Sequence, residues 1–154
     1  MKIGINGFGR IGRLTLRNIL KREGLKVVAI NDLYPAEYLA YLLKYDSSHG
    51  KLDAVIEYDD NSLIINGEKI RITSERDPSN INWSSVNADY IVEASGVFLT
   101  TELAKKHLNA GAKKVVLSAP AKDETPTFVM GVNHLDYQTN YDIISNASCT
   151  TNCL

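Results

Sequence analysis

A glycine-rich segment near the N-terminus restricts the possible folds more than any other part of the chain. Residues 7–12 are GFGRIG, which has the spacing G-x-G-x-x-G. The spacing alone is a weak signal, but here it follows an expected strand at 2–6 and opens an expected helix from 10 to about 22. The apolar run at 26–31 is a second strand that completes a βαβ unit. This context predicts a dinucleotide-binding fold.

The residues of this segment have separate physical roles. Gly7 permits a tight turn, Gly9 lets the backbone approach a pyrophosphate, and Gly12 lets the helix pack close to the strand. The N–H groups of Arg10 and Ile11, at the start of the helix, are expected to point at the phosphates. A glycine-rich turn without a ligand is the alternative, and the complete βαβ context argues against it.

Asp32 ends the second strand, where the fold type places an acidic residue that accepts hydrogen bonds from the adenosine ribose hydroxyls. A carboxylate at this position repels a 2′-phosphate. The sequence therefore predicts a preference for NAD over NADP.

The rest of the chain alternates short β-branched runs with helical segments, which is typical of an α/β fold. Asn66-Gly67 is a strong hairpin signal because both residues accept positive φ. We predict a Rossmann-type, doubly wound, mostly parallel sheet with a small antiparallel hairpin in the middle. The side chains of the first helix expected to face the core are Ile11, Leu14, Ile19 and Leu20. Further strands are expected at 54–58, 62–65, 68–73, 89–94, 114–118 and 142–146, and further helices at 35–43 and 101–109.

Charge and hydropathy exclude several classes of function. The formal net charge is -1, so nothing electrostatic indicates a nucleic-acid or membrane partner. No apolar run approaches the ~20 residues that span a bilayer. The early strand leaves no room for a signal peptide. We therefore expect a cytoplasmic protein without dedicated nucleic-acid binding.

Both cysteines lie at the C-terminal end, in the segment Ser-Cys-Thr-Thr-Asn-Cys at 148–153. Cys149 follows an expected strand and begins an expected helix, whose dipole stabilises a thiolate and makes it nucleophilic. A small buried cysteine in a strand-to-helix turn is the other interpretation, and spacing alone does not separate the two. Two cysteines without a neighbouring histidine are too few for a structural zinc site, so no metal is expected.

Five segments that occur together and in order extend these local signals. They are NGFGRIGR at 6–13, ND at 31–32, EASGVF at 93–98, LSAPAKD at 117–123 and SNASCTTNCL at 145–154. The combination resembles the phosphorylating, NAD-dependent glyceraldehyde-3-phosphate dehydrogenase family over the whole chain. The resemblance favours a catalytic Cys149.

The resemblance implies a reaction of glycolysis, in which glyceraldehyde 3-phosphate is oxidised with NAD and inorganic phosphate to 1,3-bisphosphoglycerate. Cys149 matches the nucleophile that forms a thioester with the substrate. Ser148 and Thr150 match positions that contact substrate or phosphate. The bulky Leu33, which follows Asp32, accompanies NAD preference in the family. The cofactor-contacting positions that the resemblance implies are Asn6, Gly7, Gly9, Arg10, Ile11, Gly12, Asp32, Arg76, Ser95, Gly96, Phe98 and Ser118.

The resemblance also implies a domain division and an assembly. Residues 1–148 correspond to the NAD-binding domain and 149–154 to the start of the catalytic domain, whose remainder carries the general-base histidine. We therefore expect this chain to be inactive alone and the intact protein to be a homotetramer. His49, His107 and His134 are interpreted as incidental and not as substitutes for that base.

Three other functions stay open at this stage. Erythrose-4-phosphate dehydrogenase shares the fold and the cysteine, and few substrate-selecting residues are present to decide. A non-catalytic NAD- or RNA-binding module is disfavoured by the near-neutral charge and the lack of an aromatic stacking platform. A purely structural fragment would require the glycine segment to be an empty turn.

Overall fold

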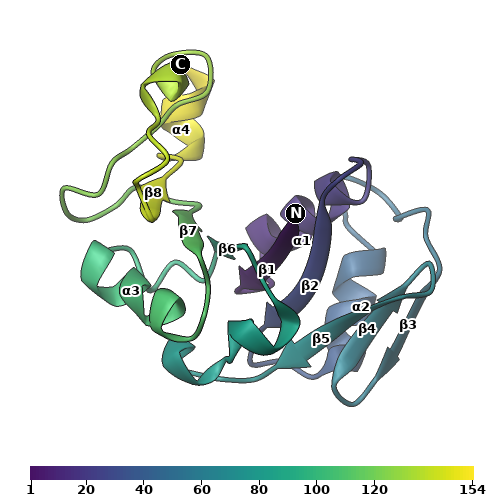
Figure 1. Ribbon diagram of the computed structural model, residues 1–154. Coiled ribbons are helices and arrows are strands. Elements are labelled where there is room, and N and C mark those ends of the chain that lie inside the picture. The colour runs from purple at the N-terminus through teal and green to yellow at the C-terminus, as the bar shows by residue number, and fades with distance from the viewer.

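The computed structural model describes residues 1–154 as one eight-stranded sheet with helices packed on it (Figure 1). None of the helices is long and apolar enough to cross a membrane. The strands are β1 (Lys2–Asn6), β2 (Lys26–Asn31), β3 (Ile56–Asp59), β4 (Ser62–Ile65), β5 (Glu68–Thr73), β6 (Tyr90–Glu93), β7 (Lys114–Leu117) and β8 (Ile143–Ser145). The α-helices are α1 (Arg10–Ile19), α2 (Ala36–Lys44), α3 (Thr101–Asn109) and α4 (Cys149–Cys153), and short 3-10 turns lie at Pro78–Asn80, Trp83–Val86 and His134–Asp136.

The strand order is β3-β4-β5-β2-β1-β6-β7-β8. Neighbours from β5 to β8 in this order run parallel, whereas β3, β4 and β5 pair antiparallel. The turn between β4 and β5 has Asn66 at φ 50° and Gly67 at φ 83°, as a tight hairpin requires. The predicted Rossmann-type fold with an antiparallel hairpin is confirmed. The strand order reverses at β1, and sheets of this kind bind ligands at the carboxyl ends beside such a point.

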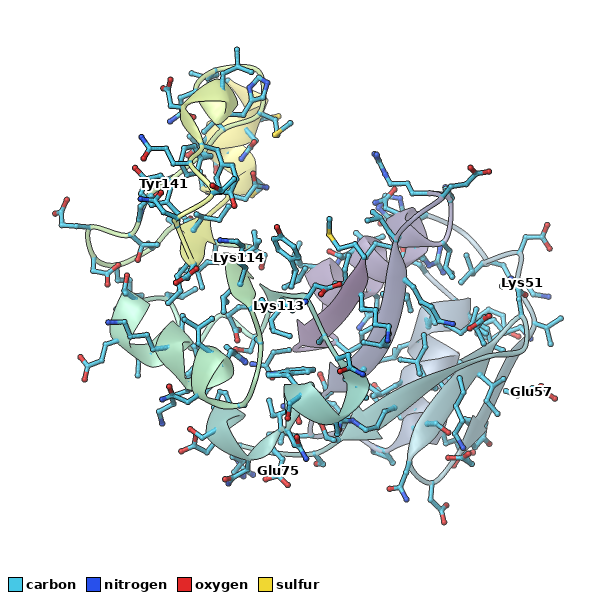
Figure 2. The ribbon with its side chains drawn as sticks, in the orientation of Figure 1. Lys51, Glu57, Glu75, Lys113, Lys114 and Tyr141 are labelled. Atoms are coloured by element: carbon cyan, nitrogen blue, oxygen red, sulfur yellow. The ribbon has the colours of Figure 1, made fainter.

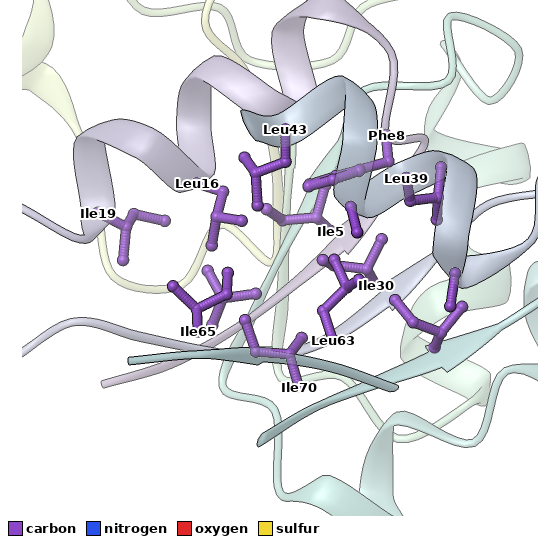
Figure 3. Close-up of a cluster of buried hydrophobic side chains, with 14 of the residues drawn as sticks. Ile5, Phe8, Leu16, Ile19, Ile30, Leu39, Leu43, Leu63, Ile65 and Ile70 are labelled. Atoms are coloured by element: carbon purple, nitrogen blue, oxygen red, sulfur yellow. The ribbon is translucent and has the colours of Figure 1, made fainter. Parts of the chain in front are cut away.

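Hydrophobic side chains cover both faces of the sheet. One cluster packs α1 and α2 on the sheet and includes Leu16 and Leu43 (Figure 3). The other cluster includes Ala104 of α3. Ala29 and Ile30 are neighbours in β2 but belong to different clusters, because successive side chains in a strand point to opposite faces.

The first helix is shorter than predicted and presents different residues to the core. α1 ends at Ile19 and not near residue 22. Ile11 is 49% exposed and Leu20 is 42% exposed, so the prediction that both face the core is wrong. Ile19 is buried as predicted, and Leu16, which was not among the predicted residues, is buried as well. Leu20 follows the last residue of α1, so the helical periodicity used for the prediction no longer applies to it. Ile11 lies in the first turn of the helix, at its exposed N-terminal end.

A long connection joins β7 to β8. Nζ of Lys114 donates hydrogen bonds to the carbonyl oxygens of Thr139 at 2.7 Å and Tyr141 at 2.8 Å (Figure 2). The C-terminal segment with β8 and α4 extends away from the half of the molecule that contains α1 and α2 (Figure 1). Val132 and Leu135 in the connection are 80% and 87% exposed, so this part of the chain leaves apolar side chains uncovered.

Asp123 joins the start of α3 to the loop that follows β7. Its Oδ2 accepts a hydrogen bond from the Thr101 N–H at 2.7 Å, and its Oδ1 accepts one from the Thr125 hydroxyl. The Thr125 hydroxyl first, and the Thr101 N–H second, hold the pKa of Asp123 below its ordinary value, because both bonds favour the carboxylate. Stability from such a carboxyl is present above its unfolded pKa and is lost as pH falls through the lower, folded pKa.

We expect Asp123→Asn to destabilise the fold near neutral pH and to have a smaller effect in acid, as pH falls through the lowered pKa of the wild-type carboxyl and its charge is lost. Urea unfolding at a series of pH values measures this difference. Asp60→Asn, which changes an exposed carboxyl, is the control. A destabilisation of Asp123→Asn that does not change with pH would contradict the assignment.

Candidate cofactor and catalytic site

The glycine segment forms a tight turn between β1 and α1. Gly7 has φ +88°, and a Cβ placed there would lie 2.6 Å from the backbone nitrogen of Ser95. A Cβ on Gly12 would collide with the Gly7 carbonyl oxygen. A Cβ on Gly9 would meet no atom within 4 Å, so this glycine faces open space. Gly7 and Gly12 are therefore required by the protein itself, whereas the open space at Gly9 is available to a ligand.

Asp32 holds the glycine segment against the end of β2. Its Oδ2 accepts a hydrogen bond from the Phe8 N–H at 2.6 Å, and its Oδ1 accepts one from the Tyr34 N–H at 3.1 Å. A carboxylate has about four acceptor positions, so two remain for the hydroxyls of a ribose. The side chain is fixed in place and still able to accept further bonds.

A cavity of about 480 Å³ lies between these segments, a size within the usual range of small-molecule sites. We call it the adenosine-side cavity. The residues predicted as cofactor contacts that line it are Asn6, Gly7, Gly9, Asp32, Arg76, Ser95 and Phe98. Its wall also contains Asn31, Leu33, Tyr34, Glu75, Ala94 and Val97. Gly96 is not part of the lining, although both of its neighbours are.

The N-terminus of α1 suits an anion. The N–H groups of Arg10 and Ile11 have no backbone acceptor. Gly9 provides no side-chain cap, and the first turn contains no acidic residue. Free N–H groups together with the helix dipole bind phosphates at such positions. The Arg10 guanidinium lies elsewhere, 3.4 Å from the Asp46 carboxylate.

A second cavity, of about 900 Å³, reaches the first turns of α1 at Ile11 and Thr15. We call it the cysteine-side cavity. It is lined by Ile11, Ser118 and Cys149, together with apolar side chains that include Val116 and Ile144. Ser118 and Cys149 were predicted separately, and the structure places them on one cavity.

Cys149 is exposed and is the first residue of α4. Ser148 is the N-cap, because its Oγ accepts a hydrogen bond from the Thr151 N–H at 2.9 Å. The amide of Asn152 donates to the carbonyl oxygens of Asn146 at 2.8 Å and Ser148 at 2.9 Å. The turn that presents Cys149 is thus held by side chains of its own segment. Thr150 is exposed and does not line the cavity.

Two of the histidines interpreted as incidental have defined surroundings. His134 lines the cysteine-side cavity, and its Nδ1 accepts a hydrogen bond from the Gly131 N–H at 2.9 Å. His107 is fully buried beside Glu93. The sequence carries no signal for either placement, because both depend on segments that are distant along the chain. No group of three or more His, Cys, Asp or Glu side chains is placed to hold a metal ion.

Comparison with known proteins agrees with this geometry. A family profile described as "Glyceraldehyde 3-phosphate dehydrogenase, NAD binding domain" matches residues 1–101. Glyceraldehyde-3-phosphate dehydrogenase of Salmonella typhimurium is 59% identical over 154 residues, which is 100% of this chain and 46% of that protein. Glyceraldehyde-3-phosphate dehydrogenase A of Escherichia coli K12 is 58% identical over 154 residues, with the same coverage. Glyceraldehyde-3-phosphate dehydrogenase of Bacteroides fragilis is 59% identical over 156 residues, which is again 46% of that protein.

The chain spans about half the length of the curated relatives that it matches. The matched profile covers the glycine segment, Asp32 and the wall of the adenosine-side cavity up to Phe98. The chain therefore belongs to the glyceraldehyde-3-phosphate dehydrogenase family and contains the NAD-binding domain of that family.

Proposed function

We propose that NAD lies across the N-terminus of α1, with its adenosine in the adenosine-side cavity and its nicotinamide toward the cysteine-side cavity. The observation that carries this proposal is that Gly9 lines the first cavity and Ile11 lines the second. A pyrophosphate at the free N–H groups of Arg10 and Ile11 would connect the two. Asp32 would hold the adenosine ribose.

For the longer protein, we propose phosphorylating oxidation of glyceraldehyde 3-phosphate. The Cys149 sulfur would attack the aldehyde carbon and form a hemithioacetal. This becomes the thioester when its carbon loses a hydride, for which bound NAD would supply the acceptor, and its hydroxyl loses a proton to the general base. The resulting thioester is cleaved when inorganic phosphate attacks the acyl carbon and the Cys149 thiolate departs. Ser148 and Thr150 would contact substrate or phosphate, and the Cys149 N–H would stabilise the developing oxyanion.

The division of the chain at residue 148 and the assembly belong to the same proposal. The strand β8 ends at Ser145 and α4 begins at Cys149, which supports a change of domain between them. The general base would come from the part of the relatives that this chain does not span. We therefore propose that the 154-residue chain binds NAD without turnover and that the longer protein is a cytoplasmic homotetramer.

Calorimetric titration with NAD and NADP tests the cofactor part of the proposal. We expect wild-type protein to bind NAD more tightly than NADP. In Asp32→Ala, NAD affinity should fall by about tenfold or more, because charge-assisted hydrogen bonds to the ribose are lost. Asp60→Ala removes an exposed carboxyl and is the matched control. Equal affinity of wild type for both nucleotides would contradict the role of Asp32.

A further inference from the structure

Four neighbouring strands of the sheet each end on a polar residue. Thr73, Asn31, Asn6 and Glu93 are the last residues of β5, β2, β1 and β6, and they are paired in register across these strands. Thr73 Oγ1 donates to Asn31 Oδ1 at 2.9 Å, and Asn31 Nδ2 donates to Asn6 Oδ1 at 2.8 Å. Asn6 Nδ2 donates to Glu93 Oε2 at 2.6 Å. We call this row the polar ladder.

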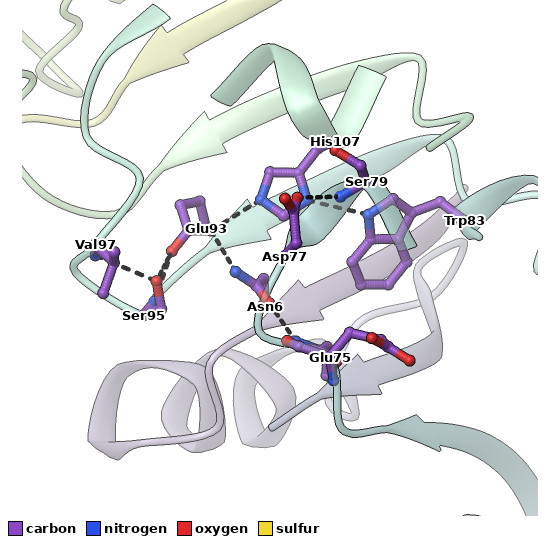
Figure 4. A network of polar contacts seen from close by, with 10 residues as sticks. Asn6, Glu75, Asp77, Ser79, Trp83, Glu93, Ser95, Val97 and His107 are labelled. Carbon is purple, nitrogen blue, oxygen red and sulfur yellow. Dashed lines mark hydrogen bonds and ion pairs between the residues drawn. The ribbon is translucent and has the colours of Figure 1, made fainter. Parts of the chain in front are cut away.

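His107 of α3 closes one end of the polar ladder (Figure 4). Its Nδ1 accepts a hydrogen bond from Trp83 Nε1 at 3.0 Å, which leaves Nε2, 2.9 Å from Glu93 Oε2, to donate to the carboxylate. The imidazole ring also packs edge-on against Phe98, with ring centroids 6.1 Å apart. His107 and Glu93 are both 0% exposed. They reach the ligand region only through other residues.

The polar ladder is bonded to two segments of the adenosine-side cavity wall. Glu93 Oε1 accepts the Ser95 N–H at 2.8 Å and also the Ser95 hydroxyl. Asn31 Oδ1 accepts the Glu75 N–H at 2.8 Å, and Asn31 Nδ2 donates to the Glu75 carbonyl oxygen at 2.9 Å. Ser95 and Glu75 both line the cavity, on segments that follow β6 and β5. One hydrogen-bonded row therefore sets the position of both segments.

We propose that His107 and Glu93 are positioning residues that hold the adenosine-side cavity in its binding shape before the nucleotide arrives. The proposal rests on the assignment of adenosine to that cavity. Every polar atom of the Asn31 amide is bonded, and four donors converge on the Glu93 carboxyl. A fully satisfied buried network of this kind permits one arrangement of its members. It therefore reduces the ordering cost that binding would otherwise carry.

A purely structural role for His107 predicts different behaviour. Such a residue would affect stability without a specific effect on nucleotide affinity, as would any deletion in the core. Leu63→Ala provides that comparison, because Leu63 is fully buried in β4 and does not line the cavity. His107→Leu removes both hydrogen bonds of the imidazole. His107→Gln is the conservative variant, because its amide keeps one donor and one acceptor.

The test titrates wild type and these variants of the 154-residue chain with NAD and with AMP by calorimetry, under conditions where circular dichroism reports folded protein. We expect His107→Leu to lower the affinity for NAD and the affinity for AMP by the same factor, about tenfold or more. In His107→Gln most of this affinity should be retained. Leu63→Ala should keep the wild-type affinity. Hydrogen exchange without nucleotide should show lower protection of the Ser95 and Glu75 amides in His107→Leu than in Leu63→Ala.

Several results would overturn the inference. One is a folded His107→Leu protein with unchanged AMP affinity and unchanged protection of the Ser95 amide. Another is a loss of affinity in Leu63→Ala as large as that in His107→Leu. If His107→Leu does not fold, Trp83→Phe, which removes the indole donor and part of a buried ring but keeps the imidazole and its bond to Glu93, takes its place in both measurements with the same expected signs. Failure of wild type to bind either nucleotide would instead contradict the proposed function.

Discussion

Replacing Gly12 with alanine should destabilise the chain by about 3 kcal/mol, at the upper end of the usual cost of overpacking. In an ordinary helix interior this substitution stabilises, by roughly 1 kcal/mol, because alanine has the higher helix propensity. Here the new methyl group meets the Gly7 carbonyl oxygen first and Ile5 Cγ2 next, at 3.2 Å. The first of these atoms is backbone, so relief requires the glycine turn to move.

Gly9→Ala is the matched control, because the same methyl group at residue 9 meets no atom of the protein within 4 Å. Its free energy of unfolding should stay within about 0.5 kcal/mol of wild type. Its NAD affinity should fall by at least about tenfold, because the methyl group fills space that the pyrophosphate needs. Urea unfolding and calorimetry on both variants measure the contrast. A Gly12→Ala protein as stable as wild type would contradict the packing described for α1.

Arg17→Met should destabilise the chain by about 3 kcal/mol or more, although arginine is usually a surface residue in a helix. Arg17 is only 7% exposed. Its guanidinium donates to the carbonyl oxygens of Leu43 at 2.6 Å, Lys44 at 3.3 Å and Gly50 at 3.0 Å. These carbonyls lie at the C-terminal end of α2 and in the loop after it, and the last carbonyl oxygens of a helix have no N–H donor within the helix.

Methionine retains the apolar length of the arginine stem but leaves the carbonyls of Leu43 and Gly50 without a donor, while that of Lys44 keeps the Leu52 N–H at 2.8 Å. Arg22→Met, at an exposed position three residues after α1 ends, is the control and should change stability by less than about 0.5 kcal/mol. Thermal and urea unfolding measure the stability of both variants against wild type. Equal stability of the two variants would show that the loop does not depend on Arg17. Arg17→Lys should fall between them, because one ammonium cannot replace a planar guanidinium that bridges separated carbonyls.

The order of strands and helices follows from the sequence because its signals are local. The strands Lys2–Asn6 and Lys26–Asn31 and the hairpin at Asn66-Gly67 depend on periodicity and turn chemistry within a few residues. The prediction for Ile11 and Leu20 is wrong, although that for Ile19 is right, because periodicity alone does not identify which stripe of α1 meets the sheet. A buried arginine was not expected at residue 17, since its partners at 43–50 are brought there by the fold.

The residues of the candidate site also fall into those that a local sequence signal predicts and those that it does not. Gly7, Gly9 and Asp32 were derived from spacing and lie on one cavity. Arg76 and Ser95 were placed only by resemblance, because an isolated arginine and a strand-end serine carry no local signal. The sequence does carry a signal for the polar ladder, because Asn6 and Asn31 end apolar strands, where a side chain that must be hydrogen-bonded is unusual.

The polar ladder also has a consequence for how the sheet assembles. Its strands are contributed by segments far apart along the chain, and a shift of one residue between parallel strands would turn each strand's side chains to the opposite face. In the native register the amides of Asn6 and Asn31 satisfy one another. In a slipped register each would be buried without its partner, at a cost of about 1–3 kcal/mol per group. The row at the strand ends therefore discriminates against misaligned sheets during folding, which the aliphatic side chains around it could not do by themselves.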